Sequence, residues 1–289
     1  MTFENHEITA KSIVTPTKVP SADFVINPYT GCQFGCLYCF ASFMGRFVGE
    51  SNDNWGNYVY VKTNAVALME KEIQRLLRKN PHPRIAISTV TDPYQGVEKK
   101  YRLTRGILQV FAKSNYQGRV GILTKSPMVL DDTDLLKTLP NAEVGLSITT
   151  TDDKLSRLLE VQAPLVSARL KTLRKLNEAG ITTYAFVGPF LPHMNFKRSL
   201  IDELFGEIKR AGTNDIKIEY LNLPKYVRPK MDIVLKKEQP DIQEVYRASQ
   251  LEDYRDELEP ILRESLFKHQ LKLKYGEIVH HVSDQELVE

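Results

Sequence analysis

The sequence predicts an α/β fold, namely a partial (β/α)6 TIM-type barrel of parallel strands with a C-terminal helical extension. Apolar, β-branched segments alternate regularly with amphipathic segments of helical period, which is typical of parallel strands joined by right-handed helical crossovers. No G-x-G-x-x-G run follows the first predicted strand, and its absence disfavours a doubly wound dinucleotide-binding sheet. The count of six strands suits an open barrel.

The chain divides into three predicted parts. Residues 1–21 are polar, contain two prolines, and are interpreted as an extended N-terminal arm. Residues 22–222 carry the alternating strands and helices of the barrel core. Residues 223–289 begin with a basic-aromatic run and continue as a charged helical stretch from about residue 239 to residue 273. We expect this extension to pack on the core across the open side of the barrel.

The first strand and the first helix flank an irregular segment that contains every cysteine. An apolar run at residues 24–26 predicts a strand over residues 22–29. Apolar residues at helical spacing predict a helix over residues 62–79, which Asn64 can cap. Residues 49–56, between them, are rich in Asn, Gly and Ser and indicate an irregular connection.

The remaining strands and helices alternate up to residue 219. Residues 84–90 (RIAISTV) are apolar on both faces, as a strand buried in a parallel sheet should be. The helix predicted at residues 164–179 has a proline at its start and Gly180 in position for its C-cap. By the same pattern we expect strands at residues 118–123, 142–148, 181–187 and 215–219, and helices at residues 104–113, 130–139 and 199–210.

Composition narrows the function classes without selecting one. An apolar content of 42% and a charged content of 26% are ordinary for a soluble globular protein. The net charge is +3 with acids and bases mixed along the chain, so composition alone does not indicate a nucleic-acid-binding protein. No targeting segment opens the sequence, and no stretch is long and apolar enough to cross a bilayer. We therefore expect a cytoplasmic protein that does not contact membranes.

The three cysteines of the chain, Cys32, Cys36 and Cys39, form one C-x3-C-x2-C run. Three thiols cannot all pair as disulfides, so a metal explains them better. Soft thiolate ligands select zinc, cuprous copper or an iron–sulfur cluster. A structural zinc site needs a fourth ligand, and the nearest histidines, His6 and His82, lie outside the loop. A 4Fe-4S cube on three cysteines would keep one iron open for an outside ligand.

Polar residues follow each predicted strand, where the active site of a parallel barrel lies. The cysteines follow the first strand, and residues 91–95 (TDPYQ) follow the second. Lys125 comes just after the third strand, so its ammonium group is a candidate for binding an anion such as a cofactor carboxylate. Ser147 lies at the end of the fourth strand. We expect these residues to gather at one rim of the barrel.

The C-x3-C-x-aromatic-C run, with Tyr38 as the aromatic residue, resembles the signature of radical S-adenosylmethionine (SAM) enzymes. In that family the amino and carboxylate groups of SAM occupy the fourth iron. Residues 27–195 further resemble the spore photoproduct lyase family, including its uncharacterised relatives. The matching phrases are NPYTGCQFGCLYCFA, WGNYVYVKTNA, STVTDPYQGVE followed by LTR, ILTKSP, LSITT, and LLEVQAP with Arg169 and LNEAGI.

The resemblance implies a partial barrel that binds one 4Fe-4S cluster through the three cysteines, with SAM beside the cluster. It places Tyr38 near the adenine, Lys125 near the methionine carboxylate and Ser147 near the ribose. Further residues at positions near the cofactor are Thr91, Glu160 and Arg169. The implied reaction is reductive cleavage of SAM to methionine and a 5′-deoxyadenosyl radical, which takes a hydrogen atom from a substrate. The cofactors carry this chemistry, and an external electron donor such as flavodoxin or ferredoxin is required.

Two departures from true spore photoproduct lyases bear on the substrate. Those enzymes carry a hydrogen-donor cysteine, whereas this chain has no cysteine outside the loop. The residue after Cys39 is Phe40, where the family leads us to expect a tyrosine. The same return path for hydrogen is therefore absent, although Tyr94 is a candidate donor. DNA lesion repair of the spore photoproduct type is accordingly an alternative, and no catalytic side chain is assigned.

Two other classes of function fit the cysteines at this point. One is a zinc-stabilised binding module that uses the three thiols and a distant histidine. The other is an iron–sulfur redox carrier, which would hold the cluster without cleaving SAM. For an enzyme, the substrate could be a nucleic acid, a peptide or a small molecule. Basic residues interleaved with tyrosine at 99–105 and 224–230 suit contacts with phosphates or bases, although such runs more commonly form a solvated face.

Overall fold

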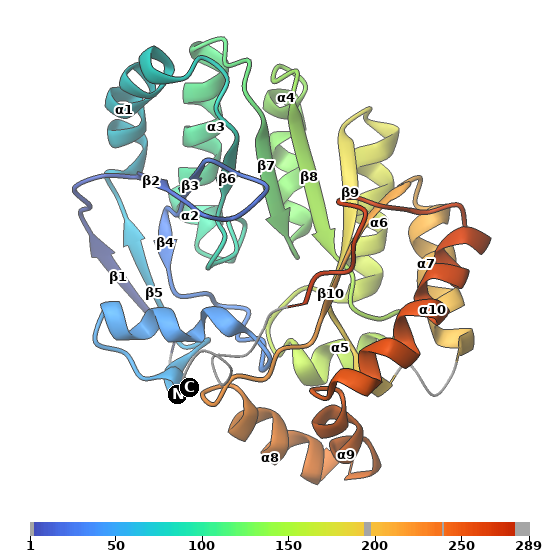
Figure 1. Ribbon diagram of the computed structural model, residues 1–289. Helices are drawn as coiled ribbons and strands as arrows, with labels where there is room; N and C mark the ends of the chain where they lie inside the picture. Colours follow the sequence, from blue (N-terminus) through green and yellow to red (C-terminus); the bar gives the residue numbers. More distant parts are fainter. Residues whose placement is uncertain (1–2, 194–197, 239, 281–289) are drawn as a thin grey trace.

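The computed structural model describes residues 3–193, 198–238 and 240–280, which form two sheets (Figure 1). The larger sheet has eight strands in the order β11-β10-β9-β8-β7-β6-β3-β2, and the smaller has three in the order β1-β5-β4. Every pair from β3 to β11 is parallel, and only β2 runs antiparallel to its neighbour in the larger sheet. The predicted α/β class with an open sheet of mainly parallel strands is confirmed.

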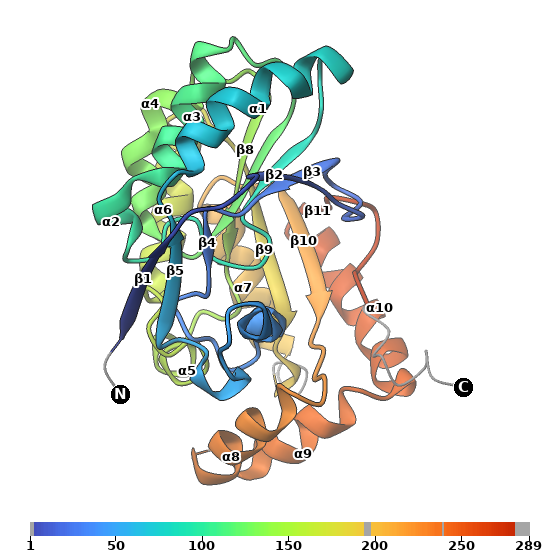
Figure 2. The ribbon, with the colours of Figure 1, turned by 90° about the vertical axis from the view of Figure 1, so that its left-hand side faces the viewer.

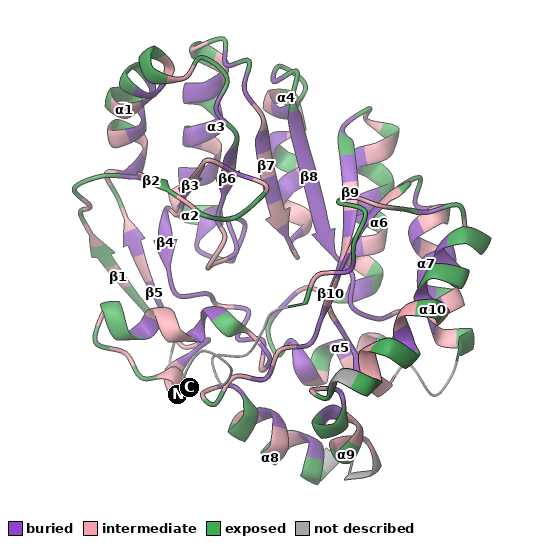
Figure 3. Cartoon of the chain, in the orientation of Figure 1, coloured by how far each residue is buried: buried purple, intermediate pink, exposed green. Residues whose placement is uncertain are grey.

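Six parallel strands and their crossovers make up the core. The strands are β3 (Phe24–Ile26), β6 (Ile85–Ile87), β7 (Val120–Thr124), β8 (Ala142–Ser147), β9 (Thr182–Phe190) and β10 (Asp215–Tyr220). The helices between them are α1 (Ala65–Lys79), α2 (Glu98–Tyr101), α3 (Leu103–Lys113), α4 (Thr133–Leu136), α5 (Asp153–Leu159), α6 (Val166–Glu178) and α7 (Arg198–Arg210). Figure 2 shows α3, α4 and α6 on one side of the sheet. Helices cover that face, so the central strand β8 is buried along its length (Figure 3).

The N-terminal segments add strands beyond the predicted six. They are β1 (Glu4–Ile8), β2 (Val14–Pro16), β4 (Tyr29–Thr30) and β5 (Tyr58–Lys62). β5 pairs in parallel with β1 and antiparallel with β4, whereas β2 forms an edge of the larger sheet beside β3. The single strand predicted at residues 22–29 is therefore wrong as one element. It breaks after Ile26 because Pro28 has no N–H for a ladder bond, and Tyr29 continues into the smaller sheet.

The helix predicted at residues 130–139 is largely replaced by tighter turns. The segment starts with the 3-10 helix η3 (Pro127–Asp132), and only the four residues of α4 are α-helical. Asp132 is buried and accepts hydrogen bonds from Tyr94 (2.9 Å) and Arg105 (2.6 Å), which draws this turn inward. Two further 3-10 helices follow the cysteines: η1 (Phe40–Phe47) and η2 (Asn52–Asn54).

The C-terminal extension is made of several elements where one helical stretch is predicted. They are α8 (Arg228–Glu238), α9 (Pro240–Ala248), α10 (Glu252–Lys268) and β11 (Lys272–Leu273). Residues 249–251 interrupt the helical stretch, and its last residues form β11, which pairs in parallel with β10. Several positions named in the sequence interpretation lie outside the described residues: 1–2 of the arm, 194–197 at the end of the matched segment, and 239 and 281–289 of the extension.

The extension also reaches the face of the sheet that carries Tyr184. The Tyr184 ring lies across Gly145 on the neighbouring strand, where a Cβ would be only 2.2 Å from the ring. Lys274, just after β11, stacks over Tyr184 at 4.8 Å from the ring centroid. Its ammonium group also binds the buried carboxylate of Glu143 on β8 at 2.8 Å. Through these contacts the segment after β11 packs against β8 and β9.

Replacing Gly145 by alanine is expected to destabilise the fold by about 1–3 kcal/mol, because the methyl group would displace the Tyr184 ring. Gly121→Ala on β7 is the matched control, since the nearest atom to its Cβ is the Ile85 carbonyl oxygen at 3.8 Å. We expect that control to change stability by no more than about 0.5 kcal/mol. Urea unfolding followed by circular dichroism measures both variants, and equal stabilities would contradict the close packing at Gly145.

Candidate functional site

The cysteine loop leaves the smaller sheet at the end of β4. Gly31 and Gly35 have φ angles of 91° and 58°, values that glycine adopts without strain. A side chain at Gly31 would also collide with β5, because its Cβ would lie 2.5 Å from the carbonyl oxygen of Tyr58. Along this tightly packed loop, Cys32 and Cys36 are buried and Cys39 is half-buried.

Two glutamines tie the loop to the segment after β6. The backbone N–H of Gln33 donates to Oε1 of Gln95 (2.9 Å), and Oε1 of Gln33 accepts from the N–H of Val97 (2.7 Å). Gln95 also donates to the hydroxyl of Thr91 (2.8 Å), which donates to the carbonyl of Gly31 (2.5 Å). Thr91, predicted near the cofactor, thus holds the backbone where the loop begins.

Asp92 links the same segment to the end of β7. Its buried carboxylate accepts from the hydroxyl of Thr124 (2.7 Å), the N–H of Lys125 (2.8 Å) and the N–H of Tyr94 (2.9 Å). Burial raises the pKa of Asp92, although these hydrogen bonds oppose the increase. The backbone of Lys125 is therefore held at the strand end.

Glu160, the residue after α5, is the centre of a buried polar network. The hydroxyl of Tyr38 and the guanidinium of Arg169 both donate to its carboxylate. The ammonium nitrogen of Lys125 lies 3.8 Å from the Glu160 Oε1 atom and 5.8 Å from the centroid of the Tyr38 ring. The carboxylate also accepts from two hydroxyls, those of Thr149 (3.3 Å) and Ser156 (2.9 Å).

In this network, charge pairing affects the pKa values of the side chains more than burial does. Burial alone would raise the pKa of Glu160, but Arg169 and Lys125 bring the pKa below its usual value. Burial would lower the pKa of Lys125, but Cys36 and Glu160 raise it overall. The pKa of Arg169 is likewise raised, because Glu160 outweighs the burial of the guanidinium. One carboxylate therefore faces two cations, which leaves one surplus positive charge beside the loop.

The cysteines are close enough to one another to interact electrostatically. Burial raises the pKa of Cys32 well above its usual value, and Asp92, Cys36 and Cys39 raise it further. Burial also raises the pKa of Cys36, to about 12, although Lys125 opposes this increase. Thiolates at these positions thus need a neighbouring positive charge, as thiolate ligation of a metal provides.

The donor set fits an iron–sulfur cluster with an anionic ligand beside it: three soft thiols in one loop, two of them buried, next to surplus positive charge. In the described ranges, no three Cys, His, Asp or Glu side chains are arranged to hold a metal ion together. Each cysteine of a cube binds a different iron. Such ligands therefore need not converge on one point.

Ser147 joins this network through its backbone. Its carbonyl at the end of β8 accepts from the guanidinium of Arg169 (3.2 Å), and its side chain is buried. The structure thus brings Tyr38, Lys125, Glu160 and Arg169 into contact, with Ser147 at their edge.

Three side chains that position the site are absent from the predicted set of cofactor contacts. Asp92 and Gln95 carry a usable signal, because they are polar residues directly after a buried strand. Gln33 carries none, because its function depends on contact with Val97, a residue far along the chain. Local sequence patterns do not contain such a contact.

Residues 26–218 match the family described as the radical SAM superfamily, a match that extends from β3 into β10 and includes the cysteine loop. The chain belongs to the radical SAM superfamily. This membership implies a 4Fe-4S cluster and SAM as cofactors and an external source of electrons. It supports the predicted radical SAM enzyme over the zinc-stabilised module and the simple redox carrier.

One relative and two solved structures of a lyase are similar to the chain. An uncharacterized protein of Methanocaldococcus jannaschii is 38% identical over 219 residues, which cover 75% of this chain and 77% of that protein. A solved structure of spore photoproduct lyase complexed with dinucleoside spore photoproduct has a TM-score of 0.72 at 19% identity and covers 96% of this chain and 82% of its own. A mutant of that lyase with bound AdoMet and the same dinucleoside has a TM-score of 0.71 at 20% identity. The match covers 95% of this chain and 81% of the mutant's chain. The predicted resemblance to this family is confirmed, and the likeness to solved structures establishes the fold.

Among the described residues, no helix combines the length and apolar character needed to span a membrane. The expected cytoplasmic location stays a prediction.

Replacing Glu160 by glutamine should cost the cluster-free protein about 3–5 kcal/mol of unfolding free energy, because Arg169 and Lys125 would lose their buried counter-charge. Glu264→Gln is the control, since Glu264 pairs with Arg198 at 3.3 Å on the exposed surface. Such a pair contributes at most about 1 kcal/mol. Anaerobic chemical denaturation measures both, and a loss at Glu160 no larger than the control's would show that the network does not depend on this carboxylate.

Proposed function

We propose that the protein is a radical SAM enzyme that binds one 4Fe-4S cluster through Cys32, Cys36 and Cys39 and abstracts a hydrogen atom from its substrate. When bound, the cluster and SAM supply a 5′-deoxyadenosyl radical through reductive cleavage of SAM. The observation that carries this proposal is the contact between the cysteine loop and the buried Lys125–Glu160 pair, at the carboxyl ends of parallel strands. Active sites of parallel barrels lie at those ends.

The residues of the network suit distinct functions in binding SAM. Lys125 has an ammonium group that Glu160 only partly neutralises, so we assign it to the methionine carboxylate. Tyr38 is held by its hydroxyl on Glu160, which leaves its ring to pack near the adenine. We assign Ser147 to the ribose, and Thr91, Glu160 and Arg169 to positioning these groups. The burial of Tyr38, Ser147, Glu160 and Arg169 also excludes water from the reacting atoms.

Anaerobic reconstitution with iron and sulfide, followed by reduction with SAM present, is expected to yield 5′-deoxyadenosine. Cys39→Ala should lose both bound iron and product. Lys125→Ala should keep its iron but require at least about 10-fold more SAM, because it lacks one charge-assisted contact. Iron analysis and chromatography of the nucleoside measure these results.

Each outcome of that experiment decides a separate point. A fully loaded wild-type cluster that gives no 5′-deoxyadenosine would contradict the proposed function. Loss of iron from the Lys125→Ala variant would contradict only the assignment of Lys125.

A DNA repair lyase of the spore photoproduct type is the alternative, favoured by the fold shared with that lyase. The chain has no cysteine outside the loop to donate hydrogen. Tyr94 is a poor substitute, because it is buried with its hydroxyl bound to Asp132 (2.9 Å). The basic run at residues 99–105 is also partly neutralised, because Arg105 forms ion pairs with Asp132 and Asp134. Adding dinucleoside spore photoproduct to the assay tests this alternative. Conversion of the lesion to the repaired dinucleotide would establish it.

We further infer that the electron donor, a flavodoxin or ferredoxin, binds on the surface next to Cys39. There η1 exposes Phe40 and Phe47, and Arg46 stacks over the Phe47 ring at 4.8 Å. The extension joins this surface, because Tyr226 donates to the carbonyl of Phe40 (3.0 Å). Partly apolar and basic surfaces suit acidic partners, and neither residues 40–48 nor residues 221–230 contain an acidic side chain.

Reversing two charges on this surface, with Arg46→Glu and Lys225→Glu together, should slow SAM cleavage driven by an acidic ferredoxin about 10-fold at low salt. The rate with dithionite should not change, because a small reductant needs no docking surface. Lys171→Glu and Lys175→Glu together, on the exposed side of α6, are the charge-matched control. A ferredoxin-driven rate equal to that control would place the docking surface elsewhere.

A further inference from the structure

Two buried hydrogen-bond donors close to the cysteine loop have no partner among the described residues. They are the indole Nε1 of Trp55 and the hydroxyl of Tyr58. Trp55 is 7% exposed and Tyr58 is fully buried. A buried donor left unsatisfied costs about 1–3 kcal/mol, so native structures contain few of them. Both donors therefore need an acceptor that the described residues do not supply.

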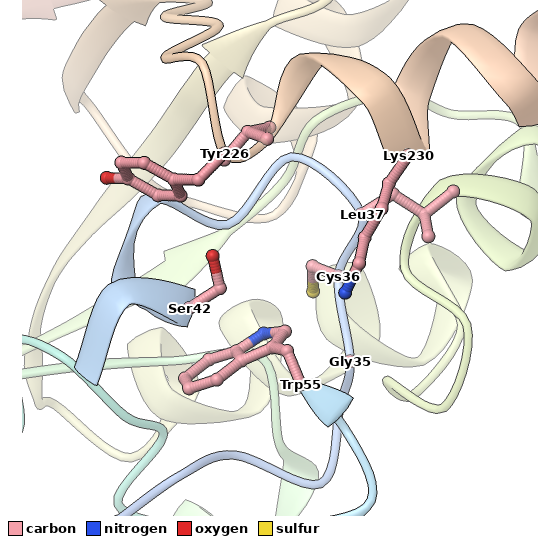
Figure 4. Close-up of a pocket in the computed structure, with 8 residues that line it drawn as sticks. Gly35, Cys36, Leu37, Ser42, Trp55, Tyr226 and Lys230 are labelled. Carbon is pink, nitrogen blue, oxygen red and sulfur yellow. The ribbon is translucent and has the colours of Figure 1, made fainter. Parts of the chain in front are cut away.

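Trp55 lines a small pocket beside the second cysteine. The pocket is formed by Trp55, Cys36 and Ser42, together with residues of the C-terminal extension. Figure 4 shows the indole nitrogen of Trp55 directed into this pocket, toward the side that Ser42 and Cys36 line. An indole N–H donates and cannot accept, so its partner must be an acceptor.

Tyr58 is enclosed between the loop and η1. Its ring packs edge-on against Trp55 with centroids 6.2 Å apart. A Cβ at Gly45 of η1 would lie 2.8 Å from the Tyr58 hydroxyl oxygen, so this oxygen is enclosed on that side. Burial raises the pKa of Tyr58, and Glu50 and Tyr60 contribute more to the increase than Cys39 and Cys32 do. A Cβ at Gly31, the residue before Cys32, would lie 2.7 Å from the Tyr58 ring, so the phenol packs against the cysteine loop that the proposed function assigns to the cluster.

Tyr60, two residues further along β5, has hydrogen-bond acceptors close to its hydroxyl. The Tyr60 hydroxyl lies within hydrogen-bonding distance of two acceptors, the carbonyl of Val48 (3.2 Å) and Glu50 (3.3 Å). Trp55 instead lines the pocket that Cys36 also lines, and the Tyr58 ring packs against Gly31, the residue before Cys32.

We propose that Trp55 and Tyr58 donate hydrogen bonds to sulfur atoms of the 4Fe-4S cluster or of its cysteine ligands, and thereby raise the reduction potential of the cluster. This inference rests on the proposed function, because it needs a cluster in the loop. Hydrogen bonds to sulfur favour the more negative, reduced state, and they are one of the main determinants of cluster potentials. Both residues are positioning residues that tune the electron transfer preceding SAM cleavage.

The first test is a redox titration of the reconstituted cluster, followed by electron paramagnetic resonance. Trp55→Phe and Tyr58→Phe should each shift the potential to more negative values than the wild type. Tyr220→Phe is the matched control, because Tyr220 on β10 also has a buried hydroxyl without a partner in the described chain. Its potential should equal that of the wild type. Unchanged potentials in both the Trp55 and Tyr58 variants would overturn the proposal.

The second test needs no substitution, so it is independent of any effect on folding. Trp55 is the single tryptophan of the chain, and indole-15N labelling therefore marks one site. Pulsed electron paramagnetic resonance of the reduced cluster should show a 15N hyperfine coupling from this nitrogen. Absence of the coupling would overturn the assignment of Trp55.

The two proposals fail in distinguishable ways. A wild-type chain that binds no cluster would contradict the proposed function. A wild-type chain that holds the cluster and forms 5′-deoxyadenosine, but whose potential does not respond to either substitution, would contradict only the inference about Trp55 and Tyr58.

Discussion

The buried carboxylate of Glu160 is the constraint on which the arrangement of the site depends. A charge removed from water must be paired, and this one is paired from separate parts of the chain: Tyr38 in the loop, Lys125 after β7 and Arg169 in α6. Folding can therefore bury Glu160 only if these parts meet. The cysteine loop, which contains Tyr38, is positioned by the same requirement. Pairing this one charge therefore assembles the site.

A second set of contacts makes the loop rigid in its own right. The reciprocal bonds between Gln33 and the segment around Gln95 satisfy backbone groups that a surface loop would leave to water. Asp92 connects that segment to the backbone of Lys125, so the loop and the ammonium group share one support. Preorganisation of this kind lowers the cost of holding reacting groups in place.

Sequence patterns predicted the local features of this protein well and its long-range pairings poorly. The six parallel strands follow from apolar runs such as residues 84–90, and the cysteine spacing points to the family, because both signals lie within a short window. The smaller sheet has no such signal, since it pairs residues 4–8 with residues 58–62 across more than fifty positions. For the same reason, the contact between Gln33 and Val97 could not be predicted from the sequence. The functions assigned to individual site residues stay predictions.

The contacts of the C-terminal extension with the loop also concern biosynthesis. Tyr226 and Lys230 line the pocket beside Cys36, and Lys230 donates to the backbone carbonyl of Asn52 in η2. These residues leave the ribosome almost two hundred positions after the cysteines. During translation the thiols are therefore in place long before the segment that covers them exists. During this interval the loop of the nascent chain lacks its cover. The cover forms once Tyr226 and Lys230 have been synthesised.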